Sequence, residues 1–292
     1  MNDDESTRYL PDELETTYSL NPEIRDVLVE GRHDELFYSE FIKKMRIDSG
    51  GLTVNVYPIG ERVHVDDECV ISSGYDVGER GRILTFSSII MDWEYEARSG
   101  ATCIADADHA YVHSDLPESD SLIVTDYSSV ESYALNVNTL DKFIRVSLRK
   151  SVPSGADLYD LIVPFLVAVF CARVALHKST FNASFDESWF KKLVTTHDAG
   201  LTMLKLAVGG SEKRPEFVAL VEEWRRLQST VIELDQRKAV RGHDIAHAII
   251  AALKLKNHWA DAGVVEGALL GCIEAVDLSE EELFIKLTKR IS

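Results

Sequence analysis

Acidic side chains follow three apolar segments of the chain at the points where these segments end. Glu30 follows "VLV", Asp106 and Asp108 follow "TCIA", and Asp126 follows "LIVT". Asp106 and Asp108 are two residues apart, so in a continuing strand both would project from the same side. Carboxylates that close repel each other, and a divalent cation removes this repulsion. Oxygen ligands suit Mg²⁺ or Mn²⁺, which the sequence therefore predicts as cofactor.

Each of these acids also has an ordinary structural interpretation. An Asp-x-Asp pair is typical of a turn or a helix cap, and Glu30 and Asp34 fit a strand-to-helix turn. Glu131, in the first turn of an expected helix five residues after Asp126, could be a surface acid. Their occurrence at successive strand ends favours a metal site.

The elements that would position these acids alternate between strands and helices in the first half of the chain. Strands are expected over 25–31, 51–60, 102–106 and 121–126, and helices over 33–45 and 78–97. Such alternation predicts an α/β fold with a parallel sheet flanked by helices. In the helix over 33–45 the spacing places Leu36, Phe37, Phe41 and Ile42 on one face.

The remaining segments suggest how the chain is divided. The polar stretch 61–78 is expected to be irregular, with a hairpin insertion, and the first twenty residues to be loose or weakly docked. After about residue 140 the apolar residues have helical spacing throughout. The predicted division is an acidic N-terminal segment (1–20), a catalytic domain (21–145) and an all-helical domain (146–292).

Composition limits the classes of partner and compartment. The chain has 292 residues, with 49 acidic and 31 basic side chains and a net charge of −18. Such a surface repels nucleic acid over most of its area, so a phosphate-bearing substrate needs a basic patch, bound metal or a basic partner. The four scattered cysteines and the lack of a signal segment predict a cytoplasmic protein. The uncharged apolar run 161–172 is too short to span a bilayer, so no membrane partner is expected.

The segment "RGHDIAH" (241–247) places His243 and His247 four residues apart, as in zinc proteases. Asp244 stands where such a protease has its glutamate, so a helix start is the simpler interpretation. A phosphohydrolase centred on His243 remains a third hypothesis. Arg241 and His243 are also candidate nucleic-acid contacts, as are the lysines Lys43 and Lys44.

Three segments together resemble a known family. "VLVEGRHDELFY" and "IADADH" are similar to the glutamate strand and DxD strand of the Toprim fold, which topoisomerases, primases and overcoming-lysogenization-defect (OLD) nucleases share. "VTDYSSVESYAL" is similar to the segment after the DxD strand in bacterial Toprim-like nucleases, the AriB-like effectors of PARIS-type anti-phage systems. The resemblance covers residues 25–140.

The resemblance implies a role for each matching residue. Glu30 would be the Toprim acid, Asp106 and Asp108 the metal-binding pair, and Glu131 an accessory metal ligand. Gly31 matches the tight turn after the glutamate, Asp34 the acid that follows it, and Asp126 the acid before Glu131.

The implied function is a magnesium-dependent endonuclease that acts on DNA or RNA, tRNA included, as the toxic effector of an anti-phage system. An ABC-type ATPase partner would hold or trigger it, and the active form would be a homodimer. The alternative is a non-catalytic regulatory or scaffold subunit that keeps the carboxylates only for structure.

Overall fold

The computed structural model describes residues 8–45, 50–113, 117–196, 198–209 and 214–292. The chain forms two compact units. The sheet unit comprises residues 1–106, 116–126 and 275–292, and the helical unit comprises residues 107–115 and 127–274.

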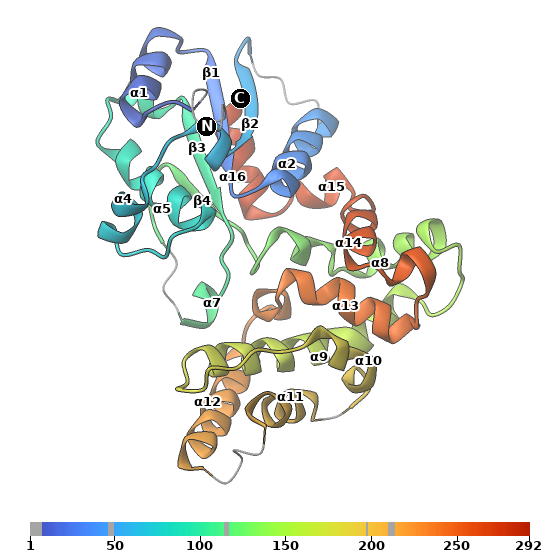
Figure 1. Ribbon diagram of the computed structural model, residues 1–292. Helices are drawn as coiled ribbons and strands as arrows, with labels where there is room; N and C mark the ends of the chain where they lie inside the picture. Colours follow the sequence, from blue (N-terminus) through green and yellow to red (C-terminus); the bar gives the residue numbers. More distant parts are fainter. Residues whose placement is uncertain (1–7, 46–49, 114–116, 197, 210–213) are drawn as a thin grey trace. The chain divides into compact units, whose positions relative to one another are not determined.

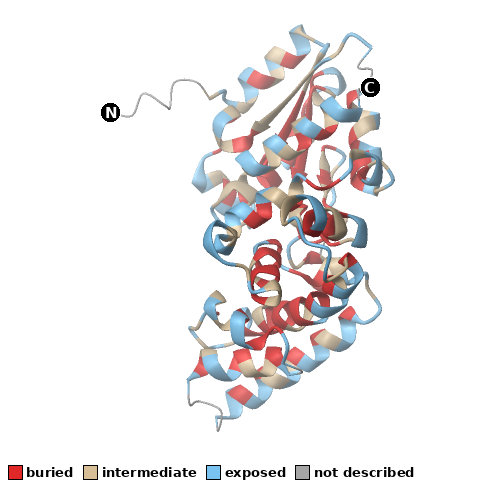
Figure 2. Ribbon diagram, turned by 90° about the vertical axis from the view of Figure 1, so that its right-hand side faces the viewer, coloured by how far each residue is buried: buried red, intermediate tan, exposed pale blue. Residues whose placement is uncertain are grey.

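The sheet unit is built on four parallel strands, which confirms the predicted α/β class (Figure 1). The strands are β1 (Ile24–Val29), β2 (Thr53–Pro58), β3 (Ala101–Ala105) and β4 (Leu122–Val124), in the order β2-β1-β3-β4. All residues of β3 are buried, as are the last four of β1 (Figure 2). Continuous apolar runs such as "ATCIA" are typical of parallel strands that are covered on both faces.

Helices cover both faces of this sheet (Figure 1). α5 (Glu79–Met91) packs on β3 and contributes Ile83, Phe86 and Ile90 to the core, whereas α2 (Arg32–Met45) contacts β2. In α2 the buried side chains are Tyr38 and Phe41, while Leu36 is exposed. The predicted apolar face was therefore wrong at Leu36, because Tyr38 occupies the core instead.

The N-terminal segment is more ordered than expected from residue 11 on. α1 (Pro11–Leu20) buries Leu14 and Tyr18 completely in the same core as α5. The prediction of a loose segment over 1–20 was wrong for this helix, because its apolar side chains complete the core of the sheet unit. Residues 1–7 lie outside the described part of the chain.

The stretch 61–78 contains two helical segments and no hairpin. It holds the end of α3 (Ile59–Arg62), then α4 (Asp67–Ser72), and α6 (Tyr95–Arg98) follows α5 further along. Val63, Val65 and Val70 are buried in the core. The prediction of a hairpin was wrong, since these three valines give the stretch an apolar side that packs. Residues 64–66 and 73–78 lie outside helices and strands, as predicted.

The chain returns to the sheet unit at its C-terminal end. α15 (Ala275–Leu278) contacts α2, and α16 (Glu282–Ile291) contacts β4. The ring of Phe284 lies 4.5 Å from that of Phe41 and 5.9 Å from that of Tyr38. The observed division thus differs from the predicted boundary at 145/146, because α16 buries its apolar stripe against α2 and the sheet.

The helical unit is formed largely by helices, as predicted for this part of the chain. Its longer helices are α8 (Val137–Lys142), α9 (Gly155–His177), α11 (Ala199–Val208), α12 (Pro215–Val231), α13 (Gly242–Leu253) and α14 (Ala262–Leu270). Shorter ones are α7 (Ala110–His113) and α10 (Phe190–Leu193), and single turns lie at Val130–Ala134, Phe143–Ser147, Glu187–Trp189, Gln236–Ala239 and Asn257–Ala260.

α9 is the central helix of this unit and contacts α8, α11, α12 and α13. Its 23 residues are long and apolar enough to cross a bilayer, but 67% of its most apolar window is buried inside the protein. This burial is consistent with the core helix of a soluble protein.

Candidate metal centre at the carboxyl ends of β1 and β3

Glu30 and Asp106 come together at the ends of two neighbouring strands. β1 ends at Val29 and β3 at Ala105, and the two strands are hydrogen-bonded partners in the sheet. The backbone N–H of Asp106 donates to Oε1 of Glu30 at 3.0 Å. From β1 the chain passes to β2 on one side and then to β3 on the other, so this junction is the topological switch point, where open α/β sheets bind ligands.

Asp34 fixes the turn that follows Glu30. Its Oδ2 accepts a hydrogen bond from the backbone N–H of Gly31 at 2.9 Å, at the start of α2. A carboxylate in the first turn of a helix satisfies a backbone N–H that has no partner within the helix. Asp34 and Gly31 thus hold the strand-to-helix turn that presents Glu30.

Asp126 has a similar structural role at the end of β4. Both of its carboxylate oxygens accept from the backbone N–H of Leu283, at 3.1 and 3.3 Å. Leu283 lies in the first turn of α16, so the carboxylate neutralises the positive end of that helix. Asp126 therefore connects the C-terminal helix to the sheet.

Tyr38 is a part of this site that sequence reasoning missed. Its side chain is almost completely buried, and its hydroxyl has no hydrogen-bond partner among the described residues. Burial raises the pKa of Tyr38 well above its usual value, and the charges of four carboxylates raise it further, namely those of Asp106, Asp34, Asp126 and Glu30. The hydroxyl therefore stays protonated, as a donor surrounded by acids.

A tyrosine at this position could have been noticed from its spacing. It lies four residues after Asp34 on α2, so both side chains share one face of the helix. An apolar pattern alone assigns it to the core, which is correct for the ring but does not account for the hydroxyl.

Arg80 brings a positive charge to the same place. It lies in the first turn of α5, and its Nε donates to the backbone carbonyl of Asp106 at 3.1 Å. A guanidinium beside a metal centre is suited to hold a phosphate oxygen. In the sequence, Arg80 lies in a "GERG" segment at the start of an expected helix, with no spacing that relates it to the acids.

The Tyr38→Phe variant is expected to fold at least as stably as the wild type and to bind Mg²⁺ about tenfold more weakly. An unpaired buried hydroxyl costs about 1–3 kcal/mol, whereas an outer-shell hydrogen bond to a metal site contributes roughly 10- to 100-fold in affinity. Thermal melts and Mg²⁺ titrations would measure the two effects. Tyr95→Phe, at an exposed tyrosine of α6, is the control. A destabilised variant with unchanged Mg²⁺ affinity would assign Tyr38 to the core alone.

The backbone turns at Asp108 instead of continuing as a strand. β3 ends at Ala105, and Asp108 has φ +48°, in the left-handed region. Its backbone N–H donates to the carbonyl of Ser128 at 2.8 Å within the helical unit, and its side chain is exposed. The strand spacing used to place Asp106 and Asp108 on the same side was therefore wrong, and Asp108 stays a predicted ligand on chemistry alone.

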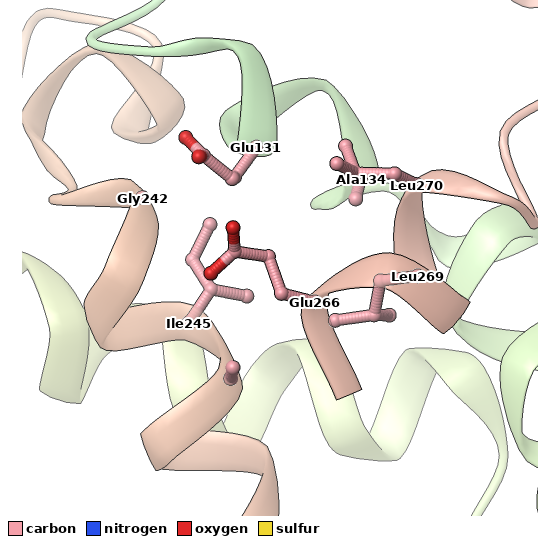
Figure 3. Close-up of a pocket in the computed structure, with 8 residues that line it drawn as sticks. Glu131, Ala134, Gly242, Ile245, Glu266, Leu269 and Leu270 are labelled. Carbon is pink, nitrogen blue, oxygen red and sulfur yellow. The ribbon is translucent and has the colours of Figure 1, made fainter. Parts of the chain in front are cut away.

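Glu131 lies in the helical unit, in the 3₁₀ turn Val130–Ala134, rather than in an α-helix. The structure places its carboxylate with two further ligand-type side chains, His243 and Glu266. Figure 3 shows the carboxylates of Glu131 and Glu266 close to each other beside the start of α13. Sequence reasoning missed Glu266, because a single glutamate in an apolar helix carries no spacing signal.

The segment "RGHDIAH" starts a helix, as its simpler interpretation held. α13 begins at Gly242, and Asp244 is buried with both carboxylate oxygens 2.9 Å from the guanidinium of Arg173. A carboxylate held in this way is a structural ion pair and is not placed as the base of a zinc protease.

The predicted nucleic-acid contacts are at separate places. Lys43 and Lys44 are exposed at the end of α2, where Lys43 lies 3.4 Å from Glu40. Arg241 is exposed, with its guanidinium 3.7 Å from Asp244. Their roles stay predictions.

Comparison with known proteins adds no assignment. No protein-family model matches the chain, and no curated protein matches it.

Proposed function

We propose that the protein is a cytoplasmic, Mg²⁺-dependent nuclease that cleaves phosphodiester bonds of DNA or RNA. The observation that supports this most is the convergence of Glu30 and Asp106 at the switch point between β1 and β3. The similarity of these segments to Toprim nucleases points in the same direction.

The residues present fit a hard divalent cation. The donors are carboxylate oxygens, which Mg²⁺ and Mn²⁺ prefer. The hydroxyl of Tyr38, which has no hydrogen-bond partner among the described residues, would donate to a carboxylate or a metal-bound water. Glu30 and Asp106 would hold the cation, with Asp108 as the third predicted ligand. When bound, the cation would stabilise negative charge on the phosphate and lower the pKa of attacking water.

The other groups of the site would position the substrate. Arg80 would bind a phosphate oxygen of the substrate. Because the protein has a net charge of −18, binding of a phosphate group requires a positive side chain nearby. A partner ATPase like that of the effectors which the sequence resembles would hold or trigger the activity, and the active form would be a homodimer.

Metal dependence is the test of this proposal. The full-length protein, incubated with plasmid DNA and separately with total tRNA, is expected to cleave one of them with Mg²⁺ or Mn²⁺ and to lose this activity in excess chelator. Growth arrest on expression is the matching measurement in cells. Cleavage that persists in chelator would contradict a metal-dependent nuclease, whereas neither cleavage nor growth arrest would favour the non-catalytic scaffold.

A further inference from the structure

A second group of metal-ligating side chains lies entirely within the helical unit. It consists of Glu131 in the turn Val130–Ala134, His243 in the first turn of α13, and Glu266 in α14. Each residue offers one ligand atom, and these three atoms lie within 4.8 Å of one another. Three ligands around a cation at about 2.1 Å lie within such distances, so small side-chain movements would complete the site.

The surroundings leave room for these ligands. Glu266 is 8% exposed, and its carboxylate lines a small pocket together with Glu131 and Gly242 (Figure 3). A Cβ at Gly242 would lie 2.1 Å from Oε2 of Glu131 and 2.5 Å from Oγ of Ser129. Glycine at the start of α13 is therefore what permits Glu131 to approach the other two ligands.

The cluster brings two carboxylates and one imidazole together. Nδ1 of His243 lies 3.3 Å from Oε2 of Glu266, a long contact, and one imidazole faces two carboxylates. Carboxylates this close repel each other, and a divalent cation between them removes the repulsion.

We propose that Glu131, His243 and Glu266 form a zinc site, separate from the Mg²⁺ centre of the sheet unit. One imidazole and two carboxylates are a typical donor set for Zn²⁺, whereas Mg²⁺ prefers oxygen ligands only. Three protein ligands would leave a fourth position open for water or another ligand. The site does not depend on the proposed nuclease activity, and it assigns Glu131 a role other than accessory ligand for Mg²⁺.

Calorimetric titration with Zn²⁺ tests the proposal on the full-length protein after removal of metal with a chelator. The wild type is expected to bind one equivalent tightly, and millimolar Mg²⁺ is expected not to displace it. His243→Ala and Glu266→Gln are each expected to lower the affinity at least about tenfold. His258→Ala is the control, because His258 is an exposed histidine of the same unit.

Two further variants separate the alternatives. Asp106→Asn is expected to keep the zinc equivalent, which distinguishes this site from the centre in the sheet unit. Gly242→Ala is expected to lose it with all three ligands still present, because its methyl group displaces Glu131. Circular dichroism establishes that each variant is folded.

The proposal is overturned if the folded wild type binds no zinc, or if His243→Ala and His258→Ala bind it equally well. It is also overturned if Asp106→Asn abolishes the equivalent, or if binding depends on His243 but not on Glu266. Loss of nuclease activity without loss of zinc binding would affect the proposed function only.

Discussion

Glu30→Gln and Asp106→Asn are each expected to abolish Mg²⁺-dependent cleavage, with a loss of at least about a hundredfold. A metal ion supplies several kcal/mol of stabilisation to the transition state, and each of these carboxylates would be one of its few protein ligands. Asp108→Asn is expected to behave in the same way if Asp108 is the third ligand. The measurement is the initial rate of cleavage at saturating Mg²⁺, with growth arrest on expression as a parallel assay.

Glu30→Gln and Asp106→Asn are both expected to fold. A glutamine at position 30 keeps a carbonyl oxygen that can accept from the backbone N–H of Asp106, so the link between the ends of β1 and β3 is retained. Removing one charge from a group of neighbouring acids also lowers their mutual repulsion, so the apo variants are expected to melt at or above the wild-type temperature.

The control is Glu96→Gln, which neutralises an exposed acid of α6 in the same unit. It is expected to change neither activity nor melting temperature. Full activity in a well-folded Glu30→Gln protein would place the active site elsewhere, and His243 would be the next residue to vary. Glu131→Gln is expected to weaken cleavage less than Asp106→Asn does, because the Glu131 carboxylate lies with His243 and Glu266.

The strands and the pairing of Glu30 with Asp106 could be predicted because they depend on short local patterns. Apolar runs such as "VLV" and "TCIA" form strands that are buried on both faces, and an acid directly after such a run stands at the edge of the sheet. Parallel pairing then brings the strand ends to one edge, whatever the crossovers contain.

The rest of the site depends on contacts between distant segments, which local patterns do not show. The Tyr38 hydroxyl acquires its surroundings from β1, β3 and β4, and Asp126 meets Leu283 from 157 positions further along the chain. The packing of α16 and of α1 also depends on distant segments. Each helix covers apolar surface of the sheet unit that the other elements leave exposed. At Asp108 the backbone adopts a left-handed conformation, so the alternation of side chains in a strand does not apply there.

A buried ion pair in the sheet unit carries the largest expected effect on stability. Asp26 lies in β1 with a fully buried side chain, and its carboxylate accepts from Nε and Nη2 of Arg62 at 2.9 and 2.7 Å. Tyr18 and Asn55 donate to it as well, at 2.9 and 3.1 Å. The guanidinium lies between two rings, 4.7 Å from the centres of Tyr9 and Tyr57.

Arg62→Met is expected to lower the free energy of unfolding by about 3–5 kcal/mol. The substitution keeps an apolar stem but leaves the Asp26 carboxylate buried with two neutral donors, and an uncompensated buried charge costs about that much. For a unit of this size the melting temperature is expected to fall by roughly 10 °C. Arg32→Met is the matched control, because the Arg32 side chain is 64% exposed and also contacts two carboxylates, those of Glu35 and Glu61. Exposed pairs contribute less than about 1 kcal/mol.

The double variant Asp26→Asn/Arg62→Met shows whether the cost arises from the unpaired charge. With asparagine at position 26 no charge remains to be buried, and the amide oxygen can still accept from the Tyr18 hydroxyl. The double variant is therefore expected to be more stable than Arg62→Met alone, so the two losses do not add. Denaturant unfolding of the wild type, Asp26→Asn, Arg62→Met and the double variant measures this coupling. If Arg62→Met and Arg32→Met lower the free energy of unfolding by the same small amount, the network does not hold α1 and α3 against β1. The apolar contacts of Leu14 and Ile59 would then have to be sufficient.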